Sequence, residues 1–518
     1  MNVDILIFCQ FSDSSNFIIR NSLFDIRYLT ERMFRQLMYT GEFMGSNRNL
    51  DVFLNPKSVA VVGATERPGS WGSFIMGGLL SRNYSGTIYP VNRRAEMVFG
   101  IPAVKNVKEI QGPVDLAVLA IPEQFVENEI KACGQKQVKG ITMITAGFAE
   151  VSGEGKNRQK DFADLANSFG TRILGPNVSG TFNLHANFNA SSTPAANLLV
   201  TALAGACQGG YAFYDILSSG WERGIGLGKF IHTGNECDLT VTDFLEHFGN
   251  DPEVKAVVMY IEAIRDGKRF VDVGGKVAQI KPVVVYKAGK TSDSARAANS
   301  HTGALAGKKE IYNGLLRQSG IIASPSMELL LPIGHALIER PPMKANRAAV
   351  MTMGGSWGVA LTDALVEAGL AVPELSPGLQ KKLRALGMPQ RASVKNPVDF
   401  GASGQFLATD LFLSLAREIL ESSEVDALIL HGVGRPGMHA EEPPDETKLF
   451  LEVEKQQIRS FSALEKELGV PVFIGSHYNP WESQVISDLN KEGIRVYNRL
   501  HEIAQVLYAL YAYWKKRL

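Results

Sequence analysis

A buried strand, a glycine-rich loop and an amphipathic helix recur in that order along this chain, and this repeat is the strongest constraint on its fold. Residues 55–86 show the repeat most clearly, and similar glycine openings occur at Gly209-Gly210 and Gly354-Gly355. Short strands that alternate with helices are typical of parallel sheets covered by helices on both faces. The repeat therefore predicts an α/β protein built from several such units.

Four further strands are expected in the first unit, at residues 87–91, 114–121, 140–146 and 172–174. Helical stretches separate them, so this unit should be a doubly wound parallel sheet. In such sheets ligands bind beyond the carboxyl ends of the strands. The loops richest in glycine, proline, asparagine and threonine follow these strands, so we expect the ligand site there.

The length of 518 residues suits about three domains. We place the three domains at residues 51–188, 189–340 and 345–518. A Ser/Thr/Pro/Ala-rich linker is expected at residues 190–197. Residues 1–50 match none of these units. They are predicted to be an N-terminal extension, either an added helix or sequence upstream of a true start at Met44.

The composition excludes several function classes. Fifty-three basic residues balance 53 acidic ones, which argues against a nucleic-acid or membrane-surface partner. The four cysteines have no CxxC spacing, so neither a disulfide framework nor a zinc site is expected, and a reducing cytoplasm suits them. No apolar run approaches the ~20 residues that cross a bilayer, and the N-terminus lacks a signal-peptide pattern.

The loop from Gly63 to Gly72 is the first candidate phosphate site, because its glycines allow close backbone approach and a helix N-terminus follows. It does not match GxGxxG. An NAD enzyme would carry an acidic residue at the end of the second strand, where this chain has Asn92, Arg93 and Arg94. Arginine suits a phosphorylated ribose, as in NADP or in the 3′-phosphate of coenzyme A. The alternative is that the arginines are solvated on a surface turn.

Residues 281–308, KPVVVYKAGKTSDSARAANSHTGALAGK, carry the second candidate. A strand at Val283–Tyr286 leads through a polar loop into a helix that begins near Ser300 and ends near Gln318. His301 would then lie at a helix N-terminus, where the environment favours a neutral, nucleophilic imidazole and attracts anions. Such a histidine can accept a phosphoryl group, although a histidine at a helix start is more often a cap.

The string SHTGALAG, preceded by KPVVVYKAG, resembles the phosphohistidine segment of the alpha subunits of NDP-forming (ADP-forming) acyl-CoA synthetases, relatives of succinyl-CoA synthetase. VAVVGATERPGSWG, YPVN, ITAGF and LGPN resemble the CoA-binding domain of that family, and NPVD again resembles the family. The resemblance covers residues 52–518. It implies an α/β chain with a Rossmann-like CoA-binding domain followed by two flavodoxin-like domains of the succinyl-CoA-synthetase type.

The resemblance also implies roles for individual residues. His301 would carry the phosphoryl group, and Glu262, in the matching YIE motif, would accept the imidazole N–H; otherwise Glu262 is a solvated carboxylate at a strand end. Gly209 and Gly210 would bind phosphate, and Tyr214 matches a tyrosine of the substrate region. The CoA contacts would be Gly63, Pro68, Gly69, Ser70, Trp71, Asn92, Arg93, Thr145 and Ala146.

The chain departs from the family where members usually show SQSG, because it has Cys207-Gln208-Gly209-Gly210 there. Two hydroxyls that would hydrogen-bond the phosphate are missing, and hydrogen bonds to a charged group are worth ~1.5–3 kcal/mol each. Restoring serine at Gly209 should then speed phosphorylation. The GNECD loop at residues 234–238 matches a family loop to which we assign a structural role.

The third unit offers weaker candidates. Residues 354–356, Gly-Gly-Ser, form either an anion site or a tight turn. His431, His439 and His477 lie near strand ends, but their spacing fits no ligand pattern, so no metal is expected. An amphipathic helix should close the chain at residues 500–518.

The implied reaction is acyl-CoA + ADP + phosphate ⇌ carboxylic acid + CoA + ATP. All three units are glycine-loop α/β units, which leaves no stretch for the ATP-grasp module that holds ADP or ATP with Mg²⁺ in this family. The chain should therefore be a cytoplasmic alpha subunit of a hetero-oligomer with a separate ATP-grasp beta subunit. Two alternatives stay open, a non-catalytic acyl-CoA-binding protein and an NADP-dependent oxidoreductase.

Overall fold

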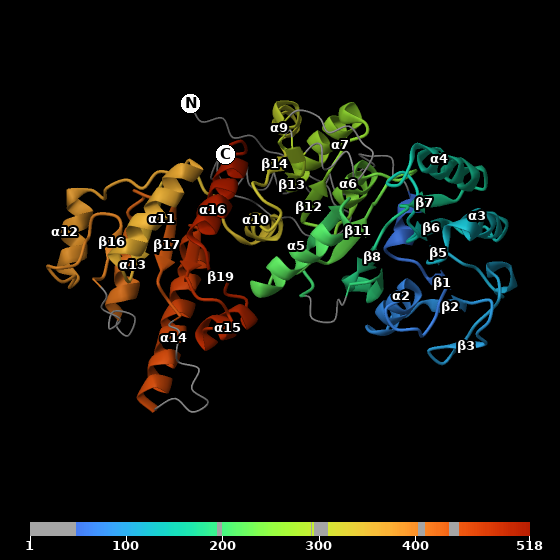
Figure 1. The fold of residues 1–518 in the computed structure, drawn as a ribbon. Coiled ribbons are helices and arrows are strands. Elements are labelled where there is room, and N and C mark those ends of the chain that lie inside the picture. The colour runs from blue at the N-terminus through green and yellow to red at the C-terminus, as the bar shows by residue number, and fades with distance from the viewer. Residues whose placement is uncertain (1–47, 194–198, 292, 295–308, 402–409, 435–444) are drawn as a thin grey trace, which may run out of the picture. The chain divides into compact units, whose positions relative to one another are not determined.

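The computed structural model describes residues 48–518 except 194–198, 292, 295–308, 402–409 and 435–444 (Figure 1). These residues belong to one compact unit, Asn47–Leu518, distinct from a unit Met1–Ser46. Residues 1–47 of the predicted extension, the predicted phosphoryl carrier His301 and the histidine at 439 lie outside the described residues.

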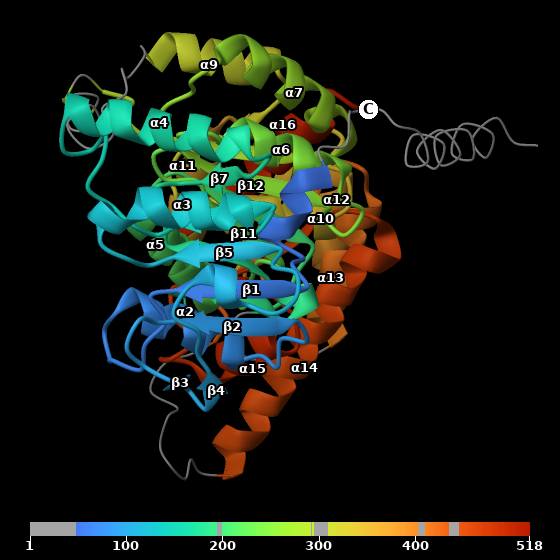
Figure 2. The same ribbon diagram turned by 90° about the vertical axis from the view of Figure 1, so that its right-hand side faces the viewer.

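The first sheet has five parallel strands in the order β2-β1-β5-β6-β7, and Figure 2 shows β2, β1 and β5 side by side. The strands of this sheet are β1 (Ser58–Val62), β2 (Thr87–Val91), β5 (Leu116–Leu119), β6 (Gly140–Met143) and β7 (Arg172–Leu174). A two-stranded ribbon consists of β3 (Met97–Val98) and β4 (Ile101–Pro102). The helices are α2 (Trp71–Leu80), α3 (Val126–Gln135) and α4 (Gly153–Ser168), with short 3-10 turns η2 (Val107–Glu109) and η3 (Glu123–Phe125). The predicted doubly wound parallel sheet is confirmed.

A short 3-10 helix, η1 (Arg48–Phe53), precedes β1 and packs against β6. Leu50, Phe53 and Leu54 are almost completely buried, with 1%, 0% and 0% of their surface exposed. The folded unit therefore includes residues before 51, and the predicted end of the extension at residue 50 was wrong by a few residues. A single 3-10 turn is too short to show a hydrophobic period, so the sequence pattern missed it.

The second sheet has seven strands in the order β14-β13-β12-β10-β11-β8-β9. Their bounds are β8 (Gly180–Asn183), β9 (Phe188–Ser191), β10 (Leu203–Cys207), β11 (Lys229–His232), β12 (Ala256–Ile261), β13 (Val283–Lys287) and β14 (Ile322–Ala323). The strands from β10 to β14 are parallel, whereas β8 and β9 extend the β11 edge in antiparallel pairing. Because β8 and β9 belong to this sheet, the first sheet ends at Leu174, well before the predicted boundary at residue 188. Strand β9 also occupies the start of the predicted linker at 190–197.

Helices cover both faces of the second sheet (Figure 1). On one face lie α5 (Gly210–Glu222) and α10 (Leu330–Glu339). On the other lie α6 (Val241–Asn250), α7 (Gly267–Ile280) and α9 (Lys309–Gln318). A short 3-10 turn, η4 (Leu184–Ala186), joins β8 to β9.

The third sheet is parallel, in the order β16-β15-β17-β18-β19. Its strands are β15 (Ala348–Thr352), β16 (Val398–Asp399), β17 (Ala427–His431), β18 (Val472–Gly475) and β19 (Val496–Tyr497). Its helices are α11 (Gly355–Ala368), α12 (Pro377–Ala385), α13 (Asp410–Glu421), α14 (Asp445–Leu468), α15 (Gln484–Lys491) and α16 (Leu500–Trp514). Counted from β1, β10 and β15, the parallel strands of each sheet follow the order 2-1-3-4-5. Each sheet therefore has a switch point between its first and third strand, where ligands bind in such folds.

The second and third sheets share one hydrophobic core, and α16 contacts both α10 and α11 within it. Arg223, the C-cap of α5, and Glu502 of α16 form a buried ion pair there, with Nη2 of Arg223 donating to Oε2 of Glu502 at 2.8 Å. The predicted C-terminal helix is confirmed, and it connects these two domains. Across the described parts of the chain, no helix combines the length and apolar character that a membrane span requires.

Candidate active site

A pocket of about 200 Å³ lies at the switch point of the first sheet, beyond the carboxyl ends of β1, β2 and β5. It is lined by Val62, Gly63, Val91, Asn92, Arg93, Arg94, Lys105, Ile121, Pro122, Phe125 and Glu129. Three predicted CoA contacts, Gly63, Asn92 and Arg93, meet in this pocket. The other six lie outside its lining. Pro68, Gly69 and Ser70 lie on the loop that follows β1, Trp71 begins α2, and Thr145 and Ala146 lie on the loop that follows β6.

Two glycines allow the end of β1 and helix α2 to pack closely. Gly63 has a φ of +92°, and a Cβ atom there would lie 2.3 Å from the carbonyl oxygen of Ala120. A Cβ atom on Gly72 would lie 2.0 Å from the Gly63 carbonyl oxygen. Ser70 caps α2, since its Oγ accepts the N–H of Ser73 at 3.4 Å. The helix N-terminus is thus held against the end of β1, which is the anion-binding arrangement expected from the sequence.

Asn92 fastens the end of β2 to the glycine loop. Its Nδ2 donates to the Ala64 carbonyl at 2.8 Å, and its Oδ1 accepts the N–H groups of Arg94 and Ala95 at 2.8 and 2.9 Å. Since the amide is occupied by bonds within the protein, Asn92 shapes the wall of the pocket.

The pocket has a basic rim with one buried acid behind it. Arg93 lies over the ring of Phe125, 4.6 Å from its centroid, and 3.6 Å from the carboxylate of Glu129. The Arg93 side chain is 60% exposed, so it can also reach a ligand. Burial raises the pKa of Glu129, while Arg93 acts in the opposite direction. Lys105, Phe125 and Glu129 were not predicted, because they come from later elements that carry no motif.

The switch point of the second sheet brings two predicted groups together, the start of α5 and Glu262. Gly209 is the N-cap of α5, and Glu262 directly follows β12. A Cβ atom on Gly209 would lie 3.0 Å from Oε1 of Glu262. Glu262 is only 9% exposed, so the alternative of a solvated carboxylate at a strand end is wrong.

Gln208 links the end of β10 to the end of β12. Its Oε1 accepts the N–H groups of Glu262 and Ala263 at 2.6 and 2.9 Å, and its Nε2 donates to the Ala263 carbonyl at 2.8 Å. Its own backbone N–H donates to the carbonyl of Tyr260 at 3.1 Å. These four bonds fix Glu262 beside the N-terminus of α5.

Lys287 contributes a cation to the same edge. It ends β13, is 4% exposed and lies over the ring of Tyr312 at 4.3 Å from the centroid. Burial lowers its pKa to about 8, and the nearby Glu262 carboxylate opposes that shift. The sequence placed Lys287 in a loop, whereas the structure places it in the strand, beside the predicted partner of the phosphoryl carrier.

Comparisons with known proteins identify the family of this chain. One family model, a CoA binding domain, matches residues 57–182, and another, a succinyl-CoA ligase-like flavodoxin domain, matches residues 201–337. The alpha subunit of the ADP-forming acetate–CoA ligase II of Pyrococcus furiosus is 37% identical over 467 residues, covering 89% of this chain and 97% of that protein. This chain belongs to the alpha-subunit family of the ADP-forming acyl-CoA synthetases.

Two further relatives of this synthetase chain support the assignment. The alpha subunit of the ADP-forming acetate–CoA ligase I of Pyrococcus furiosus is 38% identical over 358 residues, 68% of this chain and 76% of that protein. The solved dinucleotide-forming acetyl-coenzyme A synthetase 1 of Ca. Korarchaeum cryptofilum, in complex with phosphate and ADP, has a TM-score of 0.77 at 30% identity. That likeness covers 90% of this chain and 96% of that one. The predicted fold class is confirmed.

The difference from the SQSG motif removes fewer phosphate-binding hydroxyls from this synthetase than the sequence suggests. Cys207 is 2% exposed, and its Sγ donates to the carbonyl of Gly209 at 3.0 Å. Burial raises the pKa of this thiol. A hydroxyl at position 207 would be bonded to the same carbonyl, so the expectation of two lost phosphate ligands does not hold for this position. Gly209 has a φ of −95°, which any residue can adopt.

Tyr214 lies on α5, one turn after Gly210, and its hydroxyl hydrogen-bonds Oγ of Ser192. The tyrosine therefore ties the start of α5 to the segment that follows β9. The structure places it on the helix that carries the predicted phosphate-binding glycines.

The GNECD loop docks the second domain of the synthetase onto the first. Asp238 accepts three hydrogen bonds from Arg172, from Nε to Oδ2 at 2.9 Å and to Oδ1 at 3.2 Å, and from Nη2 to Oδ1 at 2.8 Å. It also accepts the backbone N–H of Ile173 at 2.9 Å, and the N–H of Asn235 donates to the Pro176 carbonyl at 2.9 Å. The structural role predicted for this loop is confirmed.

At the switch point of the third sheet, helix α11 begins at Gly355 with Gly354 as its N-cap. A Cβ atom on Gly355 would lie 2.9 Å from Oδ2 of Asp399. Because a carboxylate of the chain already lies at this helix start, the tight-turn alternative for residues 354–356 fits better than an anion site.

His431 and His477 flank Trp357, with ring centroids 5.5 and 4.6 Å from the indole. His431 is 1% exposed, and neither of its ring nitrogens has a hydrogen-bond partner within the described residues. Burial lowers its pKa to about 4. In the part of the chain that the structure describes, no group of three or more His, Cys, Asp or Glu side chains could hold a metal ion.

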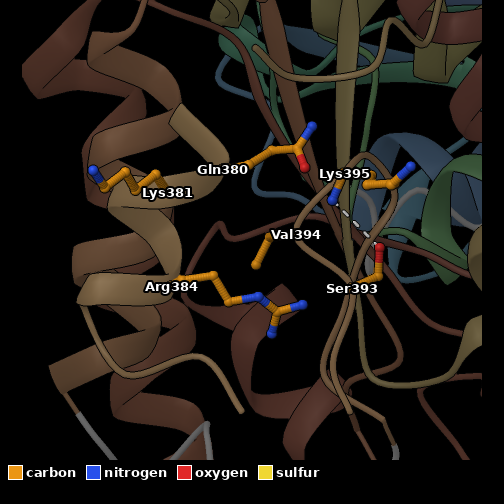
Figure 3. Close-up of a pocket in the computed structure, with 6 residues that line it drawn as sticks. All are labelled: Gln380, Lys381, Arg384, Ser393, Val394 and Lys395. Carbon is orange, nitrogen blue, oxygen red and sulfur yellow. Dashed lines mark hydrogen bonds between the residues drawn. The ribbon is translucent and has the colours of Figure 1, made fainter. Parts of the chain in front are cut away.

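A second pocket, of about 330 Å³, lies in the third domain between α12 and the segment that precedes β16 (Figure 3). It is lined by Gln380, Lys381, Arg384, Ser393, Val394 and Lys395. Arg384 reaches across it toward that segment, and its Nη2 donates to the Ala392 carbonyl at 2.6 Å. None of the predicted site residues lines this pocket, and the candidate site is therefore the one at the switch points of the first two sheets.

Proposed function

We propose that this chain is the alpha subunit of an acid–CoA ligase that interconverts acyl-CoA, ADP and phosphate with carboxylic acid, CoA and ATP through a phosphohistidine on His301. The observation that carries this proposal is the placement of Glu262 beside the N-terminus of α5, held there by Gln208. A helix N-terminus favours an anion such as a phosphoryl group, and a buried carboxylate favours a cationic phosphoimidazole.

The proposal gives each group one role. Phosphate displaces CoA from the acyl-CoA to give an acyl phosphate, and His301 takes the phosphoryl group from it with release of the carboxylic acid. The phosphohistidine then passes the phosphoryl group to ADP to give ATP. Glu262 accepts the imidazole N–H, which fixes the tautomer and stabilises the charge on the phosphorylated ring. The backbone N–H groups at the start of α5, from Gly210 onward, bind the phosphoryl oxygens.

The first-sheet pocket is the proposed CoA site. CoA is strongly anionic, and the pocket combines Arg93, Arg94 and Lys105 with the N-terminus of α2 beside it. The apolar wall of Ile121, with the ring of Phe125, suits the base of the nucleotide portion. The residues present therefore fit the ligand that the resemblance implies.

The nucleotide is assigned to a partner. Two relatives are named as alpha subunits of ADP-forming ligases, which supports a second subunit for this chain. We propose that this partner is an ATP-grasp beta subunit that holds ADP or ATP with Mg²⁺. The acid that is activated is left open, because the relatives are named for several acids, among them acetate and 4-hydroxybutyrate.

The decisive experiment is mass spectrometry of the chain after incubation with acyl-CoA and phosphate. We expect an acid-labile phosphoryl group on the peptide that contains His301, and none in His301→Asn. Equal labelling of the variant would contradict the assignment. A chain that binds acyl-CoA but takes up no phosphoryl group, even with ATP and a beta subunit, would instead be the non-catalytic binding protein.

The alternative function, an NADP-dependent oxidoreductase, is tested with the same protein preparation. Tight binding of NADP, with a nicotinamide absorbance change on adding a reducible substrate, would favour it. The family models and the relatives named above give no support to that alternative.

A further inference from the structure

The carboxyl edge of the second sheet carries a run of hydrogen bonds that links four neighbouring strands. The N–H of Ser179, just before β8, donates to Nδ1 of His232 at 2.7 Å. Nε2 of His232, at the end of β11, lies 3.0 Å from the carbonyl oxygen of Gln208, at the end of β10. Gln208 then holds Glu262, at the end of β12. The order β8-β11-β10-β12 is the order of these strands in the sheet, so the run leads from the start of β8, the neighbour of the edge strand β9, to Glu262.

The partners of His232 determine which ring nitrogen carries the proton. A backbone N–H can only donate, so Nδ1 accepts and is unprotonated, and the proton lies on Nε2, which donates to the Gln208 carbonyl. His232 is 3% exposed, and burial lowers its pKa to about 4, so the ring is neutral at neutral pH. Oγ of Ser179 also lies 2.9 Å from Nδ1.

The ring of His232 also lies directly behind the start of α5. A Cβ atom on Gly210 would come within 3.2 Å of Cε1 of His232. The imidazole therefore supports the first helical residue from behind and the preceding carbonyl from the side. A side chain at this position with no donor at the place of Nε2 would leave the Gln208 carbonyl without this hydrogen bond.

We propose that His232 is a positioning residue for phosphoryl transfer, because it holds the Gln208 peptide and so sets where Glu262 and the α5 N-terminus meet the phosphoryl group. This inference rests on the proposed function, in which Glu262 is the partner of His301. Gln208 makes three side-chain hydrogen bonds to Glu262 and Ala263, so a turn of its peptide would move the carboxylate. A displacement of about 1 Å at a reacting centre can cost about 100-fold in rate.

Two amide substitutions separate positioning from packing. In His232→Gln the terminal nitrogen can take the place of Nε2 and still donate to the Gln208 carbonyl. In His232→Asn the shorter amide reaches only the place of Nδ1 and loses that donor. We expect His232→Asn to slow the phosphorylation of His301 by about tenfold or more, and His232→Gln to stay within about threefold of wild type.

Both variants should bind CoA with the wild-type Kd, because the CoA pocket lies on the first sheet. This gives a loss in the rate of phosphoryl transfer without a loss in CoA affinity. His185→Gln is the matched control. His185 is exposed, and within the described residues its ring makes one hydrogen bond, between Nε2 and the Thr201 carbonyl. It should leave both quantities unchanged.

The outcomes separate this inference from the proposed function. Wild-type phosphorylation rates in both variants would overturn the inference, and so would an equal slowing of both variants with equal losses of thermal stability. If His232→Asn does not fold, His232→Gln decides alone, since a loss beyond about tenfold in that variant contradicts the proposed role. A wild-type chain that binds CoA but is never phosphorylated overturns the proposed function, and this inference with it.

Discussion

A Cβ atom added to Gly209 would lie 3.0 Å from Oε1 of Glu262 and 2.8 Å from Cε1 of Tyr260. The absence of a side chain at residue 209 therefore gives the carboxylate and the tyrosine ring their places beside the start of α5. On sequence grounds alone, serine at this position is a gain, because it adds a donor for a phosphoryl group. Because Glu262 and Tyr260 lie so close, the structure predicts that serine at residue 209 slows phosphorylation instead of speeding it.

We expect Gly209→Ser to slow the phosphorylation of His301 and to lower the free energy of unfolding by about 1–3 kcal/mol, because the added atoms overpack the site. Gly209→Ala adds the same Cβ without a hydroxyl, so similar losses in both variants would attribute the effect to the Cβ. Single-turnover labelling and denaturant unfolding measure the two quantities. Faster labelling of Gly209→Ser would show that Tyr260 yields and that the hydroxyl reaches the phosphoryl group.

Arg93→Ala should weaken CoA binding by about 1.5–3 kcal/mol, the value of a hydrogen bond to a charged group. If Arg93 contacts the 3′-phosphate, the variant should also bind CoA and 3′-dephospho-CoA equally, whereas the wild type prefers CoA. Isothermal titration with the two ligands checks this. Lys131→Ala is the control, because within the described residues Lys131 forms one ion pair, with the exposed Glu127. A variant that keeps the wild-type preference would place the phosphate on Arg94 or Lys105.

Asp238→Ala should lower the free energy of unfolding by about 3 kcal/mol, because it leaves the largely buried Arg172 without its bidentate partner. Denaturant unfolding of the variant measures this loss. Glu127→Ala breaks the exposed pair with Lys131 and should cause no measurable change. A small effect of Asp238→Ala would show that the backbone bonds of the GNECD loop are sufficient to dock the two domains.

The free energy of unfolding should fall as the pH drops from about 6.5 toward 4. Burial lowers the pKa of His232 and His431 to about 4 and that of His335 to about 3. Their folded-state pKa values lie below the ordinary value of 6.5, so in this window the unfolded chain binds protons that the folded chain does not. Each histidine therefore removes up to about 1.4 kcal/mol per pH unit.

Urea unfolding at pH 8, 6 and 5 measures this slope. His335→Leu should reduce it, because one buried imidazole no longer takes up a proton on unfolding. A wild-type slope in His335→Leu would mean that His335 is accessible to protons in the folded state.

Removal of residues 1–43 should leave the thermal midpoint and CoA binding unchanged, because the compact unit that holds the three sheets begins at Asn47. Removal of residues 1–54 should destabilise the first domain, since it deletes the buried Leu50, Phe53 and Leu54. Differential scanning calorimetry of the two truncated chains compares them. A large loss of thermal stability on removal of residues 1–43 alone would show that the extension is part of the fold.

The strands and helices of this chain follow closely from local sequence. Strands β2 and β7 have the predicted bounds, and α2 begins immediately after Ser70. These features depend on neighbouring residues only, on β-branched runs, caps and glycine turns, so a pattern of a few residues is enough to predict them. The family motifs are local in the same sense, and the fold class inferred from them is confirmed.

Predictions that depend on distant neighbours were less accurate. The sheet that β8 and β9 join and the buried turn at Leu50 were each missed or misplaced. An edge strand pairs through its backbone, and the burial of a residue depends on which distant elements cover it. Neither strand pairing nor burial of this kind produces a periodic pattern in the sequence.

The order of strands, loops and helices, the glycine openings and the candidate groups of the site could be predicted from local stretches of the chain. Which of these groups meet depends on how the domain packs. Gln208, His232 and Glu262 lie at the carboxyl ends of three different strands, and parallel strands joined by crossover helices bring these ends to one edge. Contacts across that edge depend on strand order and register, which are set by the packing of the whole domain and not by any local stretch of the chain.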